Sequence, residues 1–546
     1  MANYAKKKKN KSKESAGMQT TDYILSVMCS MYVFCMLCIY PLYYENKYFN
    51  MGDAKYHFFK YVSVFFLVAM LFAVVAWLAA RRKEMNFAII ARTFSYPDWF
   101  AVGFFVFSYF SFVLSEYKET AFYGYDGWYM GMMSQFAFVI IYFLVSRFWR
   151  WSPTTLLFAL GTAAITYQLG IWQRFLIDPL GMYIDLGPEY IEKFVSTLGQ
   201  TTWFSSYAVL IFPIGMFYYC YDEKKWARIF AGIFLALGYG MLATTNSDSA
   251  YVAFILILMA FFWFALESNQ TFGRFLEAVL IGLASFRVIG ICRLLFPEKQ
   301  ITLITGDEAI TAFVTGSGLM LFLLVAVAVL YGVYRYVCKV NKEFSVRKFV
   351  FLRSVMVWAA VLAVWLVLLL IILVSKEDAA PTGILQKVSE ISFFRFDDQW
   401  GNHRGFNWRM AIEAFKNASL KDVLVGAGPD CFACSMDKYC FEEVYTYWQG
   451  LQLACAHNEW LNMLVTQGVL GVASYIGIFV TVIIRMGKIG KTEPAVIPFL
   501  AATLAYMGHN FFCYQQCICT PIVFIMMGIG EMIVRHTTQE QSGKKA

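Results

Sequence analysis

A histidine and two arginines lie in one polar segment, in a pattern suited to group transfer. Arg404 and Arg409 precede His457-Asn458, which stands directly before a long apolar run. The positive end of a helix dipole favours the neutral form of a histidine at the helix N-terminus. A neutral imidazole at the water-facing end of a helical bundle can accept a proton. We therefore predict that His457 is a general base; the alternative is a capping or interfacial residue.

The arginines point to an anionic group, because a guanidinium offers a permanent, bidentate match to phosphate oxygens. Arg404 has no obvious helical partner, and we expect it to act with His457. Arg409 is a second candidate, although it could simply pair with Glu413, one helical turn further along. Arg174, in a separate external segment, could bind the same group or anchor the chain at the membrane interface.

Two more arginines, Arg287 and Arg293, lie within an apolar run. An arginine that faces lipid at mid-depth costs about 2.5–3.5 kcal/mol, so both should face the interior of a helical bundle. Their spacing puts them on different sides of a helix, so they need not bind the same phosphate. Arg293 lies near the outer end of its run and could instead extend to the interface.

The cysteines near this histidine form an incomplete metal pattern. Cys431-x-x-Cys434, Cys440 and Cys455 precede His457, but the second half lacks the CxxC or HxxxH spacing of a zinc site. An external location suggests one or two disulfides, or free thiols in an anaerobe. We predict no metal.

The composition describes a protein that crosses a membrane many times. Of 546 residues, 59% are hydrophobic, 19% aromatic and 15% charged. Soluble domains carry about a quarter charged residues. The formal net charge of +8 is too small to indicate a nucleic-acid binder. We predict an all-α polytopic membrane protein, surrounded by membrane lipid and without a nucleic-acid partner.

Fourteen apolar segments are candidates for transmembrane helices, since about 20 apolar residues in a helix cross a bilayer. They lie at residues 23–43, 58–80, 99–115, 129–148, 153–171, 203–220, 228–244, 250–267, 275–296, 313–335, 354–374, 462–485, 495–512 and 520–535. Alternate connections hold 28 of the 45 lysines and arginines, which by the positive-inside rule places both termini in the cytoplasm.

One connection is long enough to need a functional reason. The predicted organisation is a basic cytoplasmic tail at 1–22, transmembrane helices 1–11 at 23–374, an extracytoplasmic catalytic loop at 375–461, transmembrane helices 12–14 at 462–535, and a cytoplasmic tail at 536–546. Within the loop, Trp408, Ile412 and Phe415 recur at helical spacing beside a polar stripe. This predicts a short amphipathic helix in the membrane interface.

Several of these motifs together resemble the O-antigen ligase and polymerase family. They are Arg404-x-x-x-Trp408, Gly426-x-Gly428, His457-Asn458 followed after nine residues by Gly468-x-x-Gly471, the run from Ser196 to Thr202, and Gly127-Trp128 with Gly131. The chain departs from the family at Asp248, in Thr245-Asn246-Ser247-Asp248-Ser249-Ala250, where many members have Ser-Arg. This acidic residue in place of an arginine puts in doubt one contact that family members are expected to make with a substrate diphosphate.

The resemblance implies a membrane glycosyltransferase of the GT-C type that needs neither a metal nor another cofactor. Such an enzyme takes a glycan from an undecaprenyl-diphosphate carrier and joins it to an acceptor hydroxyl, on a glycan or a glycolipid, at the outer face of a bacterial cytoplasmic membrane. It implies catalytic roles for His457 and Arg404. The residues expected to bind the lipid diphosphate or the glycan are Arg409, Arg174, Arg287, Arg293, Asn458 and Trp408.

A flippase for lipid-linked oligosaccharides, or another polytopic transporter, is the alternative. Transporters are expected to carry charged residues near mid-membrane in several helices. Acidic residues are nearly absent from the middle of the apolar runs, which favours the enzyme. A scaffold or sensor is a third possibility, but no soluble output domain supports it. The motifs do not separate a polymerase from a ligase.

Overall fold

The computed structural model describes residues 2–81, 91, 93–301, 309–375 and 383–543. Over these residues the chain is nearly all helical, as the sequence predicts. The one sheet among them is a short antiparallel pair, β1 (Phe194–Val195) and β2 (Gly199–Gln200), with Phe194 opposite Gln200.

The helices are numbered in chain order. They are α1 (Ala2–Phe34), η1 (Cys35–Ile39), η2 (Tyr40–Leu42), α2 (Met51–Ala80), α4 (Tyr96–Leu114), α5 (Lys118–Tyr123), α6 (Met132–Phe148), α7 (Pro153–Arg174), α8 (Pro188–Ile191), α9 (Thr201–Tyr221), α10 (Lys225–Thr244), α11 (Asp248–Ala265), α12 (Asn269–Leu295), α14 (Ala309–Gly316), α15 (Gly318–Val340), η3 (Val346–Phe349), α16 (Leu352–Val374), α17 (Ile384–Ser389), η4 (Ser392–Phe394), α18 (Trp400–Asn417), α19 (Leu420–Val425), α20 (Phe432–Tyr439), α21 (Phe441–Tyr447), α22 (Glu459–Ile489), η5 (Pro494–Val496), α23 (Ile497–His509) and α24 (Thr520–Gly543).

Eleven helices in the described part of the chain are long and apolar enough to cross a membrane. Two further apolar helices, Met132–Phe148 and Pro494–His509, are shorter than a full span. The last predicted span corresponds to α24, which the core of the bundle surrounds along most of its length. The structure therefore supports a polytopic membrane protein, but it does not confirm the count of fourteen.

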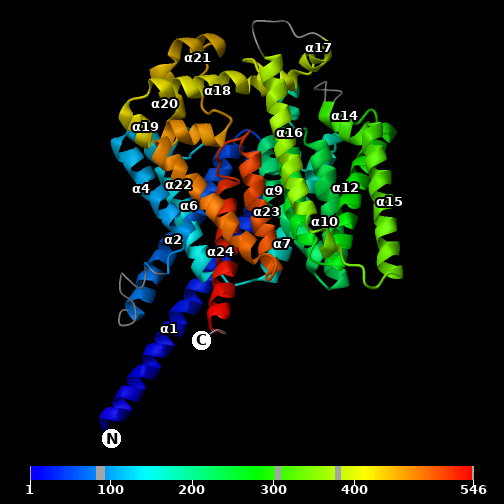
Figure 1. Ribbon diagram of the computed structural model, residues 1–546. Coiled ribbons are helices and arrows are strands. Elements are labelled where there is room, and N and C mark those ends of the chain that lie inside the picture. The colour runs from blue at the N-terminus through cyan, green and yellow to red at the C-terminus, as the bar shows by residue number, and fades with distance from the viewer. Residues whose placement is uncertain (1, 82–90, 92, 302–308, 376–382, 544–546) are drawn as a thin grey trace.

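Both chain ends lie at one end of the bundle, and a layer of short helices covers the other end (Figure 1). This layer, which we call the cap, consists of α18, α19, α20 and α21 and comes from the long loop predicted at 375–461. The short helix expected around Trp408 lies within α18. The side of α18 that packs against the protein carries Phe406, Met410 and Ala414.

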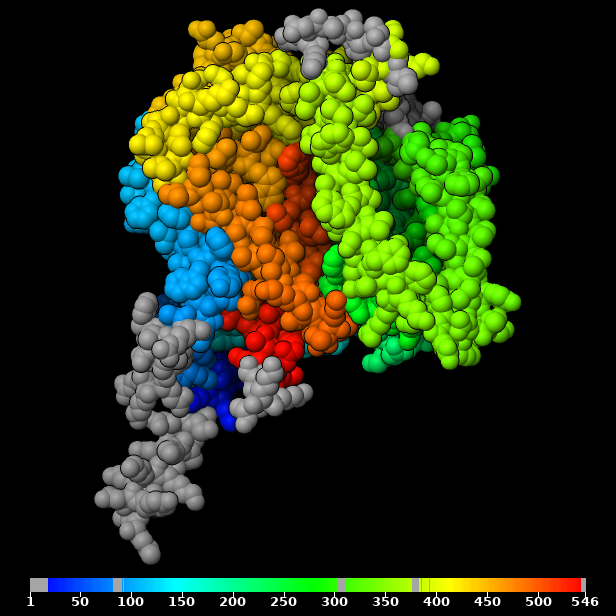
Figure 2. Space-filling view, viewed as in Figure 1, coloured from blue at the N-terminus to red at the C-terminus, as the bar shows by residue number. Residues whose placement is uncertain are grey.

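The closest helix pairs of the bundle join segments that are distant in sequence: α22 packs on α4, α11 on α23, and α6 on α24. Helices α15 and α16 are peripheral, because only 6% of each apolar window is buried inside the protein. Figure 2 shows them diverging along one side of the molecule. The rest of their apolar surface is suited to lipid, which accepts such surface without cost.

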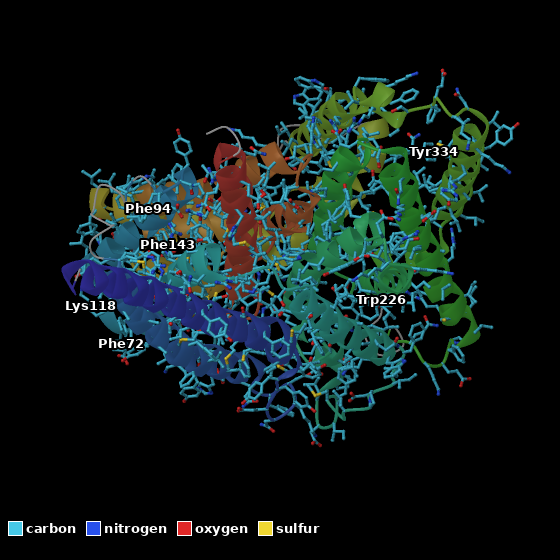
Figure 3. The ribbon with its side chains drawn as sticks, turned by 90° about the horizontal axis from the view of Figure 1, so that it is seen from below. Phe72, Phe94, Lys118, Phe143, Trp226 and Tyr334 are labelled. Carbon is cyan, nitrogen blue, oxygen red and sulfur yellow. The ribbon has the colours of Figure 1, made fainter. Side chains whose placement is uncertain are left out.

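A buried ionic cluster fixes the end of the bundle that holds the termini. Asp98 and Glu531 are fully buried. Arg485 makes two hydrogen bonds of 2.8–2.9 Å to Glu531, while Arg147 and Arg535 pair with Asp98. Phe94 and Phe143, which lie near one another in the view from below (Figure 3), flank the Arg147 guanidinium. Buried charges are tolerated only when they are paired in this way.

The glycines of the long loop explain how the cap is seated. Helix α22 breaks at Gly468, whose backbone is left-handed with φ 66°. A Cβ atom there would lie 2.5 Å from the backbone of Leu424, so only glycine allows this approach. The break frees carbonyl groups of α22, and the amides of Ala427 and Gly428 bond to those of Val465 and Thr466 at 3.2 and 3.0 Å. Main-chain hydrogen bonds therefore join the turn from Gly426 to Gly428 to the part of α22 that ends at Gly468.

Candidate active site

A cavity of about 640 Å³ lies where the cap meets the bundle. It gathers segments from six parts of the chain: the end of α7, the strand region before α9, the α10–α11 turn, the start of α18, the connection before α22, and the connection after α23. The residues that line it are Arg174, Glu192, Lys193, Gln200, Thr201, Thr202, Thr245, Asn246, Ser247, Asp248, Ser249, Val252, Phe393, Trp400, Gly401, Asn402, Arg404, His457, Phe512, Cys513 and Tyr514. Three predicted site residues, Arg404, His457 and Arg174, thus share one space.

Arg404 is held by main-chain oxygens. Its Nη1 donates to the carbonyl of Gly401 at 2.5 Å, and its Nε donates to the carbonyl of Phe512 at 3.2 Å. No carboxylate of the described chain comes within ion-pair distance of this guanidinium, so its charge is not neutralised by direct contact. An oriented cation of this kind suits an anionic substrate group.

An unusual backbone conformation precedes Arg404. Gly401, Asn402 and His403 all have left-handed φ values, between 60° and 66°. Non-glycine residues in this region cost of order 1–3 kcal/mol each and persist only where surrounding contacts enforce them. One such contact is the hydrogen bond of 2.8 Å between His403 Nδ1 and the hydroxyl of Tyr447. The sequence analysis missed this turn, which aims Arg404 into the cavity.

His457 lies at the cavity wall, just before α22. Its ring packs edge-on against Tyr514, with 5.2 Å between ring centres. Burial, and then the positive charge of Arg404, lower the pKa of His457 to about 4. The imidazole is therefore neutral at pH 7, but it is a weaker base than an ordinary histidine.

Tyr514 organises this wall, and the sequence analysis did not identify it. Its ring centre lies 4.2 Å from that of Trp128. Its hydroxyl donates to Gln200 Oε1 and accepts from Trp203 Nε1, both at 3.0 Å. The Gly127-Trp128 motif and the run that ends at Thr202 are therefore both connected to His457 through Tyr514. A tyrosine after an apolar helix gives no signal of this role by itself.

Arg174 is buried at the edge of the cavity. Its Nη2 donates to the carbonyl of Glu192 at 2.7 Å, and its Nη1 donates to that of Ile191 at 3.4 Å. Its Nε is buried without a hydrogen-bond partner. A buried donor of this kind is rare and favours a ligand contact. Arg174 thus both shapes the external segment and contributes positive charge to the cavity.

Asn458 does not line the cavity. It is buried, and its side-chain oxygen accepts a hydrogen bond of 3.1 Å from the amide of Leu461. This contact caps the N-terminus of α22 and uses the group that was expected to bind substrate. A role in fixing the backbone next to His457 therefore replaces the direct contact predicted from the sequence.

Arg409 and Trp408 also lie outside the lining of this cavity. Arg409 forms two hydrogen bonds with Asp398, at 3.0 and 2.7 Å, and not with Glu413. Trp408 packs in an aromatic cluster, 5.2 Å from Trp400 between ring centres. Trp400 does line the cavity, so Trp408 supports its wall from behind.

The two arginines of α12 that were expected to bind substrate both contact protein atoms. Arg287 Nη1 donates to the carbonyl of Thr315 at 2.9 Å, and Nη2 donates to that of Ser317. Arg293 Nε donates to Gln300 Oε1 at 3.1 Å. Neither arginine lines the 640 Å³ cavity. These contacts connect α12 with α14, with α15 and with the segment that follows α12.

A network of buried polar side chains lies beneath the cavity. His509 Nε2 is 2.9 Å from Ser205 Oγ and 3.2 Å from Ser249 Oγ, and its Nδ1 is 3.0 Å from Asn510 Oδ1. Asn510 in turn donates to the carboxylate of Glu459. The pair His509-Asn510 thus bonds within the bundle. Glu459 is a buried acid that the sequence analysis did not foresee.

The side chain of Asp430 connects the glycine-rich turn to the segment before α6. Asp430 Oδ2 accepts hydrogen bonds of 2.8 Å from the amides of Tyr125 and Met130. Burial nevertheless raises the pKa of the Asp430 carboxyl to about 7.

The cysteines nearby, Cys431 and Cys434, are free thiols, and no group of three potential metal ligands was found among the described residues.

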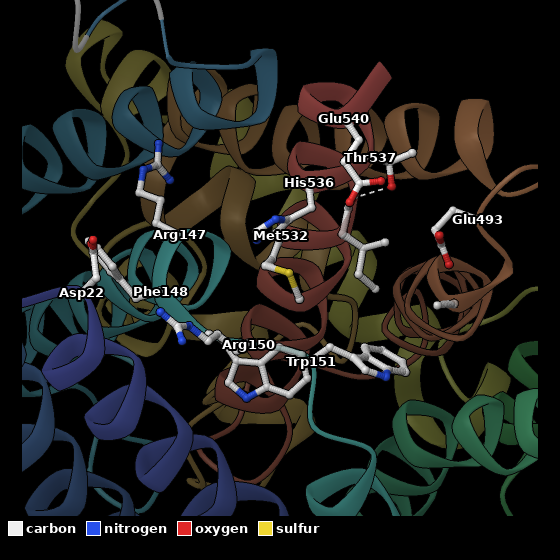
Figure 4. Close-up of a pocket in the computed structure, with 13 residues that line it drawn as sticks. Asp22, Arg147, Phe148, Arg150, Trp151, Glu493, Met532, His536, Thr537 and Glu540 are labelled. Atoms are coloured by element: carbon white, nitrogen blue, oxygen red, sulfur yellow. Dashed lines mark hydrogen bonds between the residues drawn. The ribbon is translucent and has the colours of Figure 1, made fainter. Parts of the chain in front are cut away.

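A second large cavity, of about 600 Å³, lies at the end of the bundle that holds the termini. Figure 4 shows it between Arg150, Glu493 and His536, with Met532 on one wall. None of the predicted site residues lines it. The cavity beneath the cap is therefore the better candidate for an active site.

Comparison with known proteins supports this assignment. No curated protein matches the chain. Residues 301–476 match the model of a family described as O-antigen ligase. The match includes the whole cap and extends beyond Gly471, so it covers Arg404, His457 and the paired glycine motifs. The resemblance to the O-antigen ligase family, predicted from the sequence, is confirmed over this region of the chain.

Proposed function

We propose that this protein transfers a glycan from an undecaprenyl-diphosphate carrier to an acceptor hydroxyl at the outer face of a bacterial cytoplasmic membrane. The observation that carries the proposal is the convergence of Arg404, Arg174 and His457 on one cavity inside the matched region and beside it. The family match supports a membrane glycan ligase or polymerase. The carrier, the direction of transfer and the face of the membrane belong to the proposal.

Arg404 and Arg174 would stabilise the leaving group. When the bond between the sugar and the diphosphate breaks, its electron pair leaves with the diphosphate oxygen, and negative charge accumulates there. Arg404 and Arg174 place positive charge in the cavity before the reaction begins. Preorganised charge of this kind can lower a barrier by about 2.7–4 kcal/mol for each donor. The transition state at the sugar carbon should resemble an oxocarbenium ion.

His457 accounts for the acceptor. The acceptor oxygen forms the new bond to the sugar carbon, and its hydroxyl proton moves to the neutral imidazole of His457. Burial and then the charge of Arg404 lower the pKa of His457. The negative charge of a bound diphosphate would offset the charge of Arg404 and so raise this pKa. His457 would therefore become a better base when the donor is present, which couples proton acceptance to donor binding.

The proposed orientation places the cap outside the cell and both termini inside, in agreement with the separation of cap and termini in Figure 1. A single cysteine in place of the exposed Glu442 of α21 provides a test, in a variant that lacks the 13 native cysteines. A membrane-impermeant thiol reagent should label it in intact cells. Labelling only after the membrane is opened would reverse the orientation.

The decisive experiment deletes the protein and examines the surface glycan on a gel. Loss of a length ladder down to one repeat indicates a polymerase, whereas carrier-linked chains that remain unattached indicate a ligase. With purified protein in lipid nanodiscs, lipid-linked glycan and acceptor should react in the presence of excess chelator. Unchanged glycan in the deletion strain would refute the proposal, and activity restored by magnesium or zinc would refute the metal-independent mechanism.

A further inference from the structure

Asp248 presents a carboxylate to the cavity. It is the first residue of α11, its side chain is exposed, and it lines the cavity with Arg404. In the described structure its carboxylate makes no hydrogen bond or ion pair, although Arg404 attracts it electrostatically. An acidic group with open acceptor sites is unexpected in a cavity that also holds Arg174 and Lys193.

The neighbours of Asp248 fix its direction. Ser247 Oγ lies 3.1 Å from Ser205 Oγ, and Ser249 Oγ lies 3.2 Å from His509 Nε2. Both serines are buried, so the side chains on either side of Asp248 are held by the bundle. The hydrogen bonds of these two buried serines therefore hold the Asp248 carboxylate toward the cavity.

The surroundings of Asp248 carry hydroxyl and amide groups. The cavity lining carries such side chains on both sides of Asp248 in the chain, at Asn246, Ser247 and Ser249, and also at Gln200 and Thr202. The other acid of the lining, Glu192, adjoins Lys193, which supplies a compensating charge. Asp248 has no basic residue beside it in the sequence, and in the cavity Arg404 attracts its carboxylate without forming an ion pair with it.

The chemistry of this surface differs from what a diphosphate needs. A carboxylate repels phosphate, but its two oxygens accept hydrogen bonds from neighbouring sugar hydroxyls or from a sugar amine. Hydrogen bonds to a charged group are worth more than those between neutral groups. A sugar that carries a carboxylate of its own would bring two like charges together.

We propose that Asp248 binds the glycan and selects neutral or amine-bearing sugars over acidic sugars. The inference rests on the proposed function, because it divides that cavity between a cationic region for the diphosphate and a hydroxyl-binding region for the sugar. It makes Asp248 a specificity-determining residue.

Binding measurements can test this without turnover. The probes are a neutral oligosaccharide, a uronic-acid oligosaccharide of equal length, and a short-chain polyprenyl diphosphate, each added to full-length protein in nanodiscs. The wild type should prefer the neutral probe, and Asp248→Asn should reduce that preference about tenfold, since the charged hydrogen bonds are lost. Asp248→Arg should prefer the acidic probe. Glu442→Gln, on the exposed surface of α21, is the matched control and should behave as wild type.

The diphosphate probe separates the possible failures. Its affinity should stay equal or rise in Asp248→Asn, because a negative charge has been removed. An unchanged preference between the two oligosaccharides would overturn the inference alone. Weaker diphosphate binding in Asp248→Asn would also overturn it, since Asp248 would then position Arg404. A wild-type protein that distinguishes the oligosaccharides but does not bind the diphosphate would contradict the proposed function while leaving the role of Asp248 intact. Equal melting temperatures of the variants exclude misfolding.

Discussion

The imidazole of His457 packs edge-on against the ring of Tyr514, with an angle of 72° between the ring planes. Tyr514 is itself fixed by Trp128, Gln200 and Trp203. The position of the proposed base therefore depends on segments from four distant parts of the chain.

His457→Ala should reduce turnover by about 10²–10⁴-fold, the usual contribution of a general base, and should leave binding of the lipid diphosphate nearly intact. His457→Gln keeps a hydrogen-bonding group but not basicity, so it should be almost as impaired. Tyr514→Phe retains the ring contact and loses only the hydroxyl bonds, and we expect a smaller loss. Turnover rates with saturating donor measure all three. Near-normal turnover of His457→Gln would make His457 a positioning residue.

The pH dependence should reveal the lowered pKa of His457. In the free enzyme, activity should fall as pH drops through about 4, because the imidazole must be neutral to accept a proton. An unperturbed histidine would titrate near pH 6.5. Bound diphosphate should raise this pKa, so the acid limb of kcat should lie at higher pH than that of kcat/KM. Identical acid limbs near pH 6.5 in both profiles would contradict the lowering of this pKa by burial and by the charge of Arg404.

Replacement of Arg404 should separate charge from geometry. Arg404→Lys retains the charge but loses the planar fork that spans Gly401 and Phe512, and it should lose most activity. Arg409→Lys is the matched control on the same helix, since Arg409 pairs with Asp398 outside the cavity. We expect it to keep most activity in the same glycan-transfer assay. Equal effects of the two substitutions would argue for a general requirement for charge in α18.

Asp430 should make stability depend on pH. Its folded pKa, about 7, lies above the ordinary value of about 3.9, so the folded state retains a proton that the unfolded state releases between these values. Its contribution is therefore fully present below pH 4 and is lost as pH rises through 7. Asp430→Asn should flatten the change of melting temperature over this range, measured by intrinsic fluorescence in nanodiscs.

Asp430→Ala should lower the melting temperature at every pH, since each amide that loses its acceptor costs about 1–3 kcal/mol. Glu442→Gln serves as the control for a change of surface charge. A pH profile of Asp430→Asn that coincides with the wild type would show that another group titrates in this window.

The sequence predicted the helical membrane architecture and brought Arg404, His457 and Arg174 into one hypothesis. Residue type and order suffice for this, because apolar runs and an intervening polar loop are local properties. Partners that depend on folding were not predictable. Arg409 chooses Asp398 over Glu413, and the left-handed turn before Arg404 has no signature beyond one glycine.

The span count shows a related limit. Hydropathy marks α24 as a span, but the helix is enclosed by its neighbours, and α6 is shorter than a bilayer crossing. An apolar helix inside a large bundle and one that faces lipid have similar compositions. The sequence likewise does not decide the role of Asn458, because its amide can bind a substrate or cap a helix; in the structure it caps α22.

Besides the side-chain packing of α18 and α20 against α22, one joint between the cap and α22 is made of main-chain atoms and glycines, at Gly468 and at the turn from Gly426 to Gly428. Such a joint does not depend on which side chains the cap carries elsewhere. Substitutions at the exposed positions of α21 can therefore accumulate without breaking this joint. Recognition of a new acceptor could evolve on a scaffold that keeps its reaction centre unchanged.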